Sequence, residues 1–167
     1  MHVNTLTYSS PCGKLILGEL QGQLVFCDWD PGRNAARVLR LLGLTSFENP
    51  VPLLTLAAGQ LDEYFCRCRR SFSFPLRLVG TPFRTAVWQA LSELEYGTTL
   101  SYSSLARLMG LPPSSTRALA SAVGANPLSI LLPCHRIIGA DSSLRGYAGG
   151  LDAKKFLLDH EMTFFRD

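Results

Sequence analysis

Residues 101–124 read SYSSLARLMGLPPSSTRALASAVG, and this stretch decides the expected fold of the second half of the chain. Its pattern predicts a helix over Tyr102–Met109 and a second helix that runs through Val123, with a turn at Pro112-Pro113 between them. The expected caps are Ser101 and Ser114, and the expected stops are Gly110 and Gly124. Two short helices joined by a tight turn form the helix-turn-helix pattern, which also occurs in proteins that never touch DNA.

The second of these helices carries small side chains on its outer face. Leu119 and Val123 lie four residues apart and are expected to pack inward, while Arg117 and Ser121 share another side. The small residues between these two sides are Ser114, Ala118 and Ala122. Such a face suits close packing against a neighbouring helix, or close approach to a nucleic-acid groove with Arg117 as the one long side chain, and the pattern favours neither.

The dipeptide Thr81-Pro82 divides the chain into two parts of different character. After it the pattern is helical, beginning with a helix that Thr81 caps, that runs to Leu94 and that Tyr96-Gly97 closes. The last helix is expected from Leu151 to about Glu161. Before the division, the expected strands are Val3–Tyr8, Leu15–Leu20 and Leu24–Trp29, with a hairpin turn at Gln21-Gly22. The expected helices are Asn34–Leu42, with Gly43 as its stop, and Leu53–Phe65. The stretch Phe72–Leu78 suits a strand or an extended linker. We therefore expect an α+β (α/β) protein, with one domain over 1–78 and a second over 79–167.

The composition indicates a folded globular protein. Apolar residues make up 47 % of the chain and charged residues 17 %, which is more apolar surface than a disordered chain carries. There is no apolar run of the roughly 18 residues that a membrane-spanning helix needs. The N-terminus from Met1 to Thr5 lacks the basic and apolar regions of a secretory signal. We therefore expect a cytoplasmic monomer with no membrane partner.

The basic residues are mainly arginine. The formal net charge is +3, and lysine occurs only at Lys14, Lys154 and Lys155 among the 16 basic residues. Arginine suits phosphate and base recognition because its guanidinium group donates hydrogen bonds in a flat fork. Ordinary surface chemistry produces the same composition, so charge alone indicates no particular partner.

The five cysteines are not expected to form a disulfide framework, because their number is odd and a cytoplasmic compartment is reducing. Cys66-Arg67-Cys68 is tighter than the usual CxxC spacing of zinc sites. We expect no metal and no cofactor. The cysteines expected to be buried thiols are Cys12, Cys27, Cys66 and Cys68.

Cys134 stands in the run Leu132-Pro133-Cys134-His135-Arg136. A thiol reacts as its thiolate, and a neighbouring imidazole or guanidinium group lowers its pKa, so Cys134 is a candidate nucleophile. Adjacent side chains often point apart, however, and a cysteine after an apolar run is more often a core residue. Glu161 can orient His135 and complete a Cys-His-Glu relay, or it is a solvated charge near the end of the chain.

Several further motifs occur in order between Thr81 and Glu161. They are Thr81-Pro82-Phe83, Val87-Trp88, Tyr96–Tyr102, Leu105-Ala106, Arg117-Ala118, Asn126-Pro127, Pro133–Gly139, Gly146–Gly150 and Leu157–Glu161. In this order and with similar gaps, they resemble the O6-alkylguanine-DNA alkyltransferase family, also called methylated-DNA–protein-cysteine methyltransferases. The N-terminal part resembles the family's ribonuclease-H-like domain through Ser10–Leu15 and Leu61–Phe65. The resemblance implies a winged-helix-like C-terminal domain that contains the helix-turn-helix.

This resemblance implies repair of double-stranded DNA by irreversible transfer of a methyl or other alkyl group from O6-alkylguanine, or from O4-alkylthymine, to a cysteine that reacts once. The implied catalytic residues are Cys134 as acceptor, His135 as its base through a water, Glu161 orienting His135, Asn126 bracing the turn before Cys134, and Tyr102 donating a proton to the flipped base. The implied DNA contacts are Arg117, which enters the duplex, with Thr116, Ala118, Ala120 and Ser121 beside it. The implied pocket residues are Tyr102, Cys134, Ile137, Tyr147 and Ala148.

These residue types fit that chemistry. An alkyl group on an aryl-like oxygen needs a soft, charged nucleophile and a proton for the departing oxygen, which a thiolate and a phenol supply. The base must also leave the helical stack, and a small-residue helix in the minor groove with one inserted side chain can stabilise that state.

Two other classes of function stay open. Related non-catalytic proteins bind alkylguanine lesions without repairing them, but they carry a different residue at the position of Cys134. A cysteine hydrolase would need a catalytic histidine distant in sequence, and it would leave the helix-turn-helix unexplained. The chain also departs from the family at several positions. Leu119 and Ala120 stand where many relatives have valine and glycine. Ala148 stands where a hydroxyl residue occurs, and this difference predicts a pocket open to bulkier alkyl groups.

Overall fold

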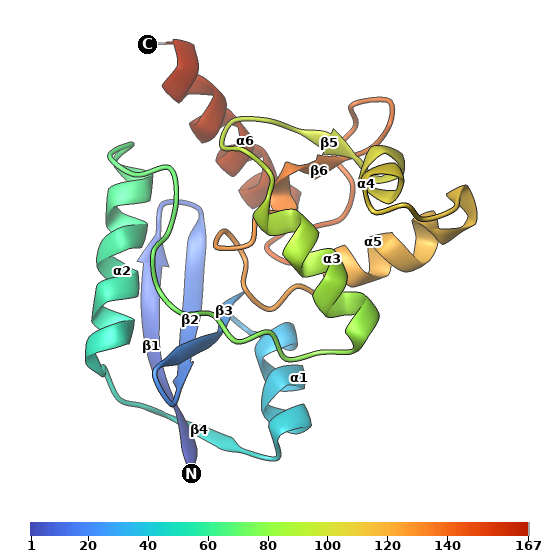
Figure 1. Cartoon of the computed structure of the whole chain (residues 1–167). Coiled ribbons are helices and arrows are strands. Elements are labelled where there is room, and N and C mark those ends of the chain that lie inside the picture. Colours follow the sequence, from blue (N-terminus) through green and yellow to red (C-terminus); the bar gives the residue numbers. More distant parts are fainter. Residues whose placement is uncertain (167) are drawn as a thin grey trace. The chain divides into compact units, whose positions relative to one another are not determined.

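The computed structural model describes residues 1–166, with side chains described as far as Met162. The chain folds into two compact units, each with its own set of internal contacts. The first unit contains Met1–Gly80 and Pro127–Leu131, and the second contains Thr81–Asn126 and the chain from Leu132 onward. Helices and strands occur together, which confirms the expected α+β class (Figure 1).

The first unit is built on a four-stranded sheet. Its strands are β1 (His2–Ser10), β2 (Gly13–Leu20), β3 (Gln23–Trp29) and β4 (Thr45–Glu48), in the order β3-β2-β1-β4. β1, β2 and β3 pair antiparallel, and β4 pairs parallel to β1. The predicted hairpin turn is confirmed, with Gln21 at φ 53° and Gly22 at φ 81°, the left-handed pair that a tight two-residue hairpin uses. The strand β4 was not predicted, because its four residues are all exposed and show no inward-outward alternation.

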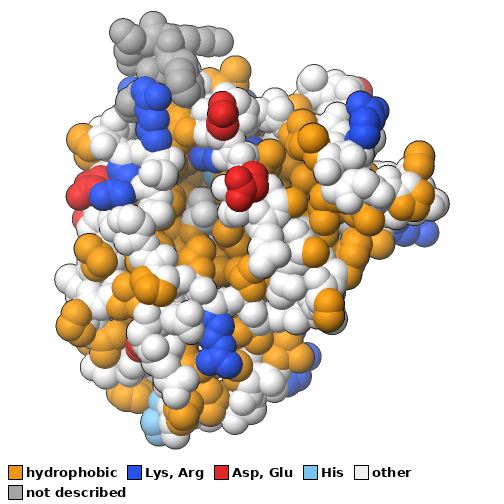
Figure 2. Space-filling view, in the orientation of Figure 1, with side chains coloured by type: hydrophobic (Ala, Val, Ile, Leu, Met, Phe, Trp, Pro, Cys, Tyr) orange, Lys and Arg blue, Asp and Glu red, His pale blue; other side chains and the backbone are white. Residues whose placement is uncertain are grey.

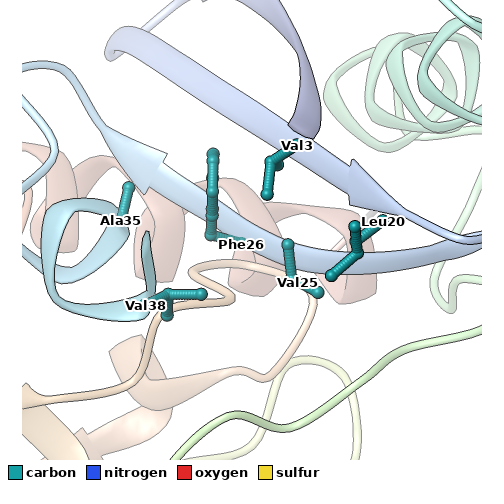
Figure 3. Close-up of a cluster of buried hydrophobic side chains, with 6 residues drawn as sticks. All are labelled: Val3, Leu20, Val25, Phe26, Ala35 and Val38. Carbon is teal, nitrogen blue, oxygen red and sulfur yellow. The ribbon is translucent and has the colours of Figure 1, made fainter. Parts of the chain in front are cut away.

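Two helices pack on this sheet. Helix α1 (Arg33–Leu42) contacts β3, and α2 (Pro52–Phe65) contacts β1, β2 and β3. A cluster of buried apolar side chains from the strands and α1 consists of Val3, Leu20, Val25, Phe26, Ala35 and Val38 (Figure 3). Asp28 at the end of β3 accepts hydrogen bonds of 2.9 Å from the backbone N–H groups of Asn34 and Ala35, and so caps α1 from the sheet. Gly43 ends the helix at φ 65°, as predicted.

Gly18 shows why a glycine stands in the middle of β2. A Cβ atom at this position would overlap the ring of Phe26 on the neighbouring strand. The space of the missing side chain is filled by this ring, which belongs to the core cluster. Any larger residue at position 18 would push the ring out of the core.

Strand β3 also binds two segments that lie outside the sheet in sequence. Leu24 forms backbone hydrogen bonds of 2.9 Å with Pro75 and Arg77, so the stretch around Leu76 is an extended linker with one bridge rather than a regular strand. Cys27 forms backbone hydrogen bonds of 2.8 Å with Pro127 and Ser129. The chain thus re-enters the first unit at Pro127, although this segment lies beyond the boundary expected at residue 79, and leaves it after Leu131.

The second unit consists of short helices around one small parallel sheet. Its elements are α3 (Pro82–Ser92), β5 (Leu100–Ser101), α4 (Tyr102–Leu108), the 3-10 turn η1 (Pro113–Ser115), α5 (Thr116–Gly124), the 3-10 turn η2 (Cys134–Arg136), β6 (Ile137–Ile138) and α6 (Leu151–Arg166). Two predicted caps are confirmed: the Thr81 hydroxyl accepts from the Arg84 N–H at 3.3 Å, and the Ser101 hydroxyl accepts from the Ser104 N–H at 3.1 Å. Buried Trp88 of α3 donates from Nε1 to the carbonyl of Ala122 in α5 at 2.8 Å.

Three details of the predicted helices are wrong. Helix α3 ends at Ser92 rather than Leu94, and Glu93 is its C-cap. Ser114 does not cap α5, because Pro113 begins a 3-10 turn that Ser114 lies within, so the helix starts only at Thr116. Gly124 is the last residue of α5 and does not take the left-handed conformation of a stop.

Among the described residues, no helix combines the length and the apolar character that crossing a bilayer requires. Figure 2 shows that lysine and arginine side chains on the visible face lie in separate small groups, with apolar side chains between them. The net charge of +3 is therefore not gathered in one patch on this face.

Candidate active site

Cys134 begins the turn η2, directly after Leu132-Pro133. Its side chain is 5 % exposed, so the sulfur is almost enclosed by protein. The carbonyl of Leu132 accepts two hydrogen bonds, one from the Cys134 N–H at 2.7 Å and one from Asn126 Nδ2 at 2.9 Å. The buried amide of Asn126 therefore holds the backbone immediately before Cys134.

His135 and Glu161 form a buried pair. His135 Nε2 lies 2.8 Å from Glu161 Oε1, and the two side chains are 0 % and 1 % exposed. A carboxylate can only accept, so Nε2 carries the proton and the other ring nitrogen, Nδ1, carries the lone pair. Nδ1 is buried and has no hydrogen-bond partner among the described residues. The ring is thus held in the tautomer that leaves Nδ1 as a base.

Arg136 fixes the carboxylate of Glu161 from the other side. Its Nε and Nη2 donate to the two carboxylate oxygens, each at 2.9 Å, in a bidentate pair. Its Nη1 donates to the carbonyl of Leu94 at 2.6 Å, and the guanidinium carbon lies 5.6 Å from the centre of the Tyr96 ring. The backbone N–H of Gly97 adds a hydrogen bond of 3.3 Å to Glu161 Oε2. These hydrogen bonds and opposite charges offset the cost of removing the Arg136–Glu161 ion pair from water, so the pair is stable in the protein interior.

The charges of this group follow from burial and pairing. Burial lowers the pKa of His135 below its ordinary value, and this outweighs the opposing effect of the neighbouring carboxylate, so the imidazole is neutral near pH 7. Burial alone would raise the pKa of Glu161, but the hydrogen bonds and charges of His135 and Arg136 outweigh burial and hold that pKa far below its ordinary range. The site therefore contains a neutral base oriented by a permanent carboxylate.

Tyr102, the first residue of α4, is half-buried and interacts electrostatically with Cys134. Burial raises the pKa of its phenol, negative charge on Cys134 raises it further, and Arg145 opposes both. The phenol keeps its proton at neutral pH and can donate it.

A small cavity opens beside Cys134. It is partly open to solvent and is lined by Val123, Gly124, Asn126, Cys134, Gly146, Tyr147 and Ala148. Three of the five expected pocket residues, Cys134, Tyr147 and Ala148, are in this lining. Tyr102 and Ile137 are not: Ile137 is fully buried and pairs with Leu100 between β6 and β5.

Helix α5 divides into a buried and an exposed side. Leu119 and Val123 are buried, as predicted from their spacing. Ala122, on the small-residue side between these two, is buried and its carbonyl accepts from Trp88 of α3, which fits the alternative of packing against a neighbouring helix. The exposed residues on the other side include Arg117, Ala118 and Ser121, with Thr116 and Ala120 half-buried.

The sequence of this chain is similar to those of known proteins. Residues 82–163 match the family model "6-O-methylguanine DNA methyltransferase, DNA binding domain". The chain is 36 % identical to the constitutive methylated-DNA–protein-cysteine methyltransferase of Bacillus subtilis, over 96 % of both chains. It is 37 % identical to the methylated-DNA–protein-cysteine methyltransferase of Methanosarcina acetivorans, over 92 % of this chain and 95 % of that one. The chain belongs to the methylated-DNA–protein-cysteine methyltransferase family.

Solved structures agree with this methyltransferase membership. The crystal structure of the Mycobacterium tuberculosis O6-methylguanine methyltransferase has a TM-score of 0.81 and 34 % identity, and covers 97 % of this chain and 93 % of that one. The structure of the M. tuberculosis OGT in complex with DNA has a TM-score of 0.82 at the same identity, over 98 % of this chain and 94 % of that one. The 82–163 range of the methyltransferase model includes every expected catalytic residue, from Tyr102 to Glu161.

One residue of this methyltransferase site was missed. Lys154 of α6 is fully buried, and its Nζ donates to the carbonyls of Ile137 at 2.6 Å and Arg145 at 3.0 Å. Burial lowers the pKa of Lys154, and negative charge on Cys134 raises it, so ammonium and sulfur interact. A signal existed in the sequence: Lys154 lies three residues before Leu157 and seven before Glu161, on the stripe of α6 that faces inward.

The remaining cysteines of this methyltransferase differ in exposure. Cys27 is buried and Cys12 half-buried, but Cys66 and Cys68 are exposed, so the expectation that both are buried thiols is wrong. The cause is that Cys66 and Cys68 lie just beyond the end of α2, where the apolar stripe of that helix has stopped. The described residues contain no group of three or more histidine, cysteine or acidic side chains placed to hold a metal ion.

Proposed function

We propose that this protein repairs DNA by moving an alkyl group from the O6 atom of a guanine to the sulfur of Cys134, once per molecule. The observation that carries the proposal is the buried hydrogen-bonded group that directly follows Cys134 in the chain, with His135 Nε2 at 2.8 Å from Glu161 and Arg136 Nε at 2.9 Å from Glu161. A structural cysteine needs no oriented neutral base beside it. The names of the related proteins, which are methylated-DNA–protein-cysteine methyltransferases, support the same conclusion.

The reaction begins with a proton transfer. His135 Nδ1 takes the proton of the Cys134 thiol through an intervening water, and the resulting imidazolium is stabilised by Glu161. The Lys154 ammonium stabilises the thiolate, because its interaction with Cys134 is attractive only when the sulfur is charged. A thiolate produced in an almost enclosed site is more reactive than one in water, since fewer waters must be removed from it.

The transfer itself balances. The thiolate attacks the alkyl carbon, the bond from that carbon to O6 breaks, and its electron pair passes to the base. Tyr102 donates its phenolic proton to the base and regains a proton from the imidazolium through solvent. The net exchange moves the alkyl group from O6 to sulfur and one proton from sulfur to guanine. The thioether product has no leaving group that water can displace, so each molecule reacts once.

The exposed side of α5 is the proposed DNA contact. Ala118 and Ser121 are small and exposed, so the helix can approach a groove closely. Arg117 is the long exposed side chain beside them, and we propose that it enters the duplex where the damaged base has turned out. Helix α5 also ends at Val123 and Gly124, which line the cavity beside Cys134, so a base that leaves the stack near α5 lies close to the pocket.

The substrate range follows from the pocket. Ala148 lines the cavity with a methyl group in place of a hydroxyl group, and we propose on this ground that the site accepts alkyl groups larger than methyl. The same chemistry applies to O4-alkylthymine, which also carries an alkyl group on an aryl-like oxygen. Guanine is the proposed main substrate because the matching family model is named for 6-O-methylguanine.

We further propose that the two domains have the family architecture. An antiparallel β3-β2-β1 sheet with β4 parallel to β1 supports a ribonuclease-H-like domain over 1–78. The pair α4 and α5 next to the β5–β6 sheet supports a winged-helix-like domain over 79–167. Within that range, residues 79–80 and Pro127–Leu131 group with the first unit.

The proposal is tested by incubating the protein with a duplex that contains O6-methylguanine and measuring its intact mass. We expect a gain of one methyl group per molecule and no turnover beyond one equivalent. Tight binding to the lesion without any mass gain would instead indicate a lesion-binding protein. Repeated turnover on an ester or amide would indicate a hydrolase.

A further inference from the structure

Two exposed sulfur atoms lie side by side at the end of helix α2. The Sγ atoms of Cys66 and Cys68 are 3.0 Å apart, and both side chains are exposed. A disulfide bond is about 2.05 Å long, so these sulfurs need to approach by only about 1 Å to bond. Both residues belong to the first unit, whereas Cys134 belongs to the second.

The backbone that ends α2 holds the two thiols together. Cys66 is the C-cap, and Arg67 takes the left-handed conformation at φ 66°. The N–H groups of Arg67 and Cys68 donate to the carbonyls of Tyr64 at 3.1 Å and Glu63 at 2.8 Å. This is the Schellman arrangement, in which one left-handed residue turns the chain back at the end of a helix. Here it brings the side chains of Cys66 and Cys68, before and after Arg67, to the same side.

The two sulfurs influence each other. The hydrogen bond between them and negative charge on Cys66 raise the pKa of Cys68. The Glu63 carboxylate nearby is itself paired with Arg69 at 2.6 Å, which reduces its repulsion of a thiolate. Both thiols are exposed, and an exposed thiol reacts with a disulfide through its thiolate form.

We propose that Cys66 and Cys68 are a redox-active dithiol that small-molecule disulfides such as oxidised glutathione convert to an intramolecular disulfide. One thiolate attacks the small disulfide, which forms a mixed disulfide and releases one small thiolate. The second protein sulfur loses its proton to solvent and attacks the first protein sulfur, which forms the Cys66–Cys68 bond and releases the second small thiolate. The protein loses two electrons, and the small disulfide gains them.

The other thiols are much less suited to this exchange. Cys27 and Cys134 are buried, and burial raises the pKa of the half-buried Cys12. Oxidation is therefore confined to Cys66 and Cys68, just beyond the end of α2. This proposal does not depend on the proposed alkyl transfer, because neither cysteine belongs to the site around Cys134.

The test treats the full chain with oxidised glutathione, stops the exchange with acid, labels the remaining thiols under denaturing conditions and measures intact and peptide masses. Of the five thiols, we expect two to disappear, with the loss of two hydrogens and a disulfide within the peptide that contains Cys66 and Cys68. Dithiothreitol should restore both thiols. Mixed disulfides with glutathione as the final product, a disulfide between any other pair, or five labelled thiols would overturn the proposal.

Single variants separate the pair from general thiol reactivity. Cys66→Ser and Cys68→Ser should each stop at one glutathione adduct, whereas Cys12→Ser should oxidise like the unmodified chain. Arg67→Gly preserves a left-handed residue at the helix end and should still form the disulfide. Alkyl transfer to Cys134 should be the same in all four variants, so failure of one proposal is distinguishable from failure of the other.

Discussion

His135 donates a hydrogen bond of 2.8 Å to Glu161, and both side chains are almost completely shielded from solvent. Because the proton on Nε2 is committed to the carboxylate, Nδ1 is the ring nitrogen that the proposed proton transfer from Cys134 would use. Arg136 in turn keeps the carboxylate ionised and in place. The predictions below follow from this arrangement and from the charged groups around it.

Replacing the carboxylate of Glu161 should remove both the orientation of His135 and the negative charge that pairs with Arg136. In Glu161→Gln, the amide can donate as well as accept, so His135 is no longer held in one tautomer, and Arg136 is left as a buried charge without its partner. We expect the rate of alkyl transfer to fall by about 10² to 10⁴. The free energy of unfolding should fall by about 3–5 kcal/mol. Single-turnover kinetics and urea unfolding measure these two effects.

The matched control is Asp159→Asn on the same helix, which removes an exposed carboxylate that pairs with Lys155. It should change the rate and the stability little. Glu161→Asp retains the charge and should recover part of the rate if the variant with glutamine proves poorly folded. A normal transfer rate in folded Glu161→Gln contradicts the role given to the pair.

The dependence on pH follows from the lowered pKa of His135, which burial causes. The neutral ring is the base, so the transfer rate should be constant from about pH 8 down to about pH 6.5, the ordinary value for histidine, and should fall only below it. The unfolded chain binds the proton more readily than the folded chain. Stability should therefore be fully present above about pH 6.5 and be lost as the pH falls through the lower pKa of the folded state.

Glu161 adds a second loss of stability at lower pH, because its pKa is also lowered in the folded state. Urea unfolding at a series of pH values should show both steps. A transfer rate that already declines between about pH 8 and pH 7 would mean that the imidazole is charged in the resting protein.

Lys154 should favour the thiolate form of Cys134. Lys154→Met retains most of the buried side-chain volume but removes the ammonium group that interacts with the sulfur. The pH at which Cys134 begins to react with iodoacetamide should rise, and alkyl transfer at neutral pH should slow by about tenfold for each 1.4 kcal/mol of lost stabilisation. Lys155→Met, at the exposed neighbouring position, is the control. Identical iodoacetamide profiles in the two variants would exclude an electrostatic role for Lys154.

Arg117 should matter for DNA and not for the chemistry. Arg117→Ala should weaken binding to a lesion-containing duplex and slow repair at low protein concentration, because an exposed arginine on α5 is lost. Reaction with a free alkylguanine base should keep its rate, since Arg117 is not among the residues that line the cavity. Arg40→Ala, which removes an exposed arginine of α1, should leave both rates unchanged. Equal slowing with duplex and free base would place Arg117 in the reaction itself.

The sequence was sufficient for most elements whose signals are local. The turn at Gln21-Gly22, the stop at Gly43 and the caps at Thr81 and Ser101 depend on neighbouring residues, and all four are confirmed. The start of α5 was wrong because a proline can open a 3-10 turn as readily as it precedes a helix.

Contacts between distant residues were harder to predict. Cys134 and His135 drew attention because they are adjacent, but no pattern linked Arg136 to Leu94 or Lys154 to Ile137. Both bonds end on backbone carbonyls, and every residue has such a carbonyl, so the sequence contains no sign of which one is used. Lys154 was recognisable only from its place on the inward stripe of α6.

The most direct test of the central claim identifies which sulfur receives the alkyl group. A duplex whose O6-methylguanine carries an isotope-labelled methyl group is incubated with the protein, and the peptides of all five cysteines are analysed. We predict one equivalent of label, all of it on Cys134, and none on any peptide of Cys134→Ser. Label on another cysteine, or label retained by Cys134→Ser, would contradict the account.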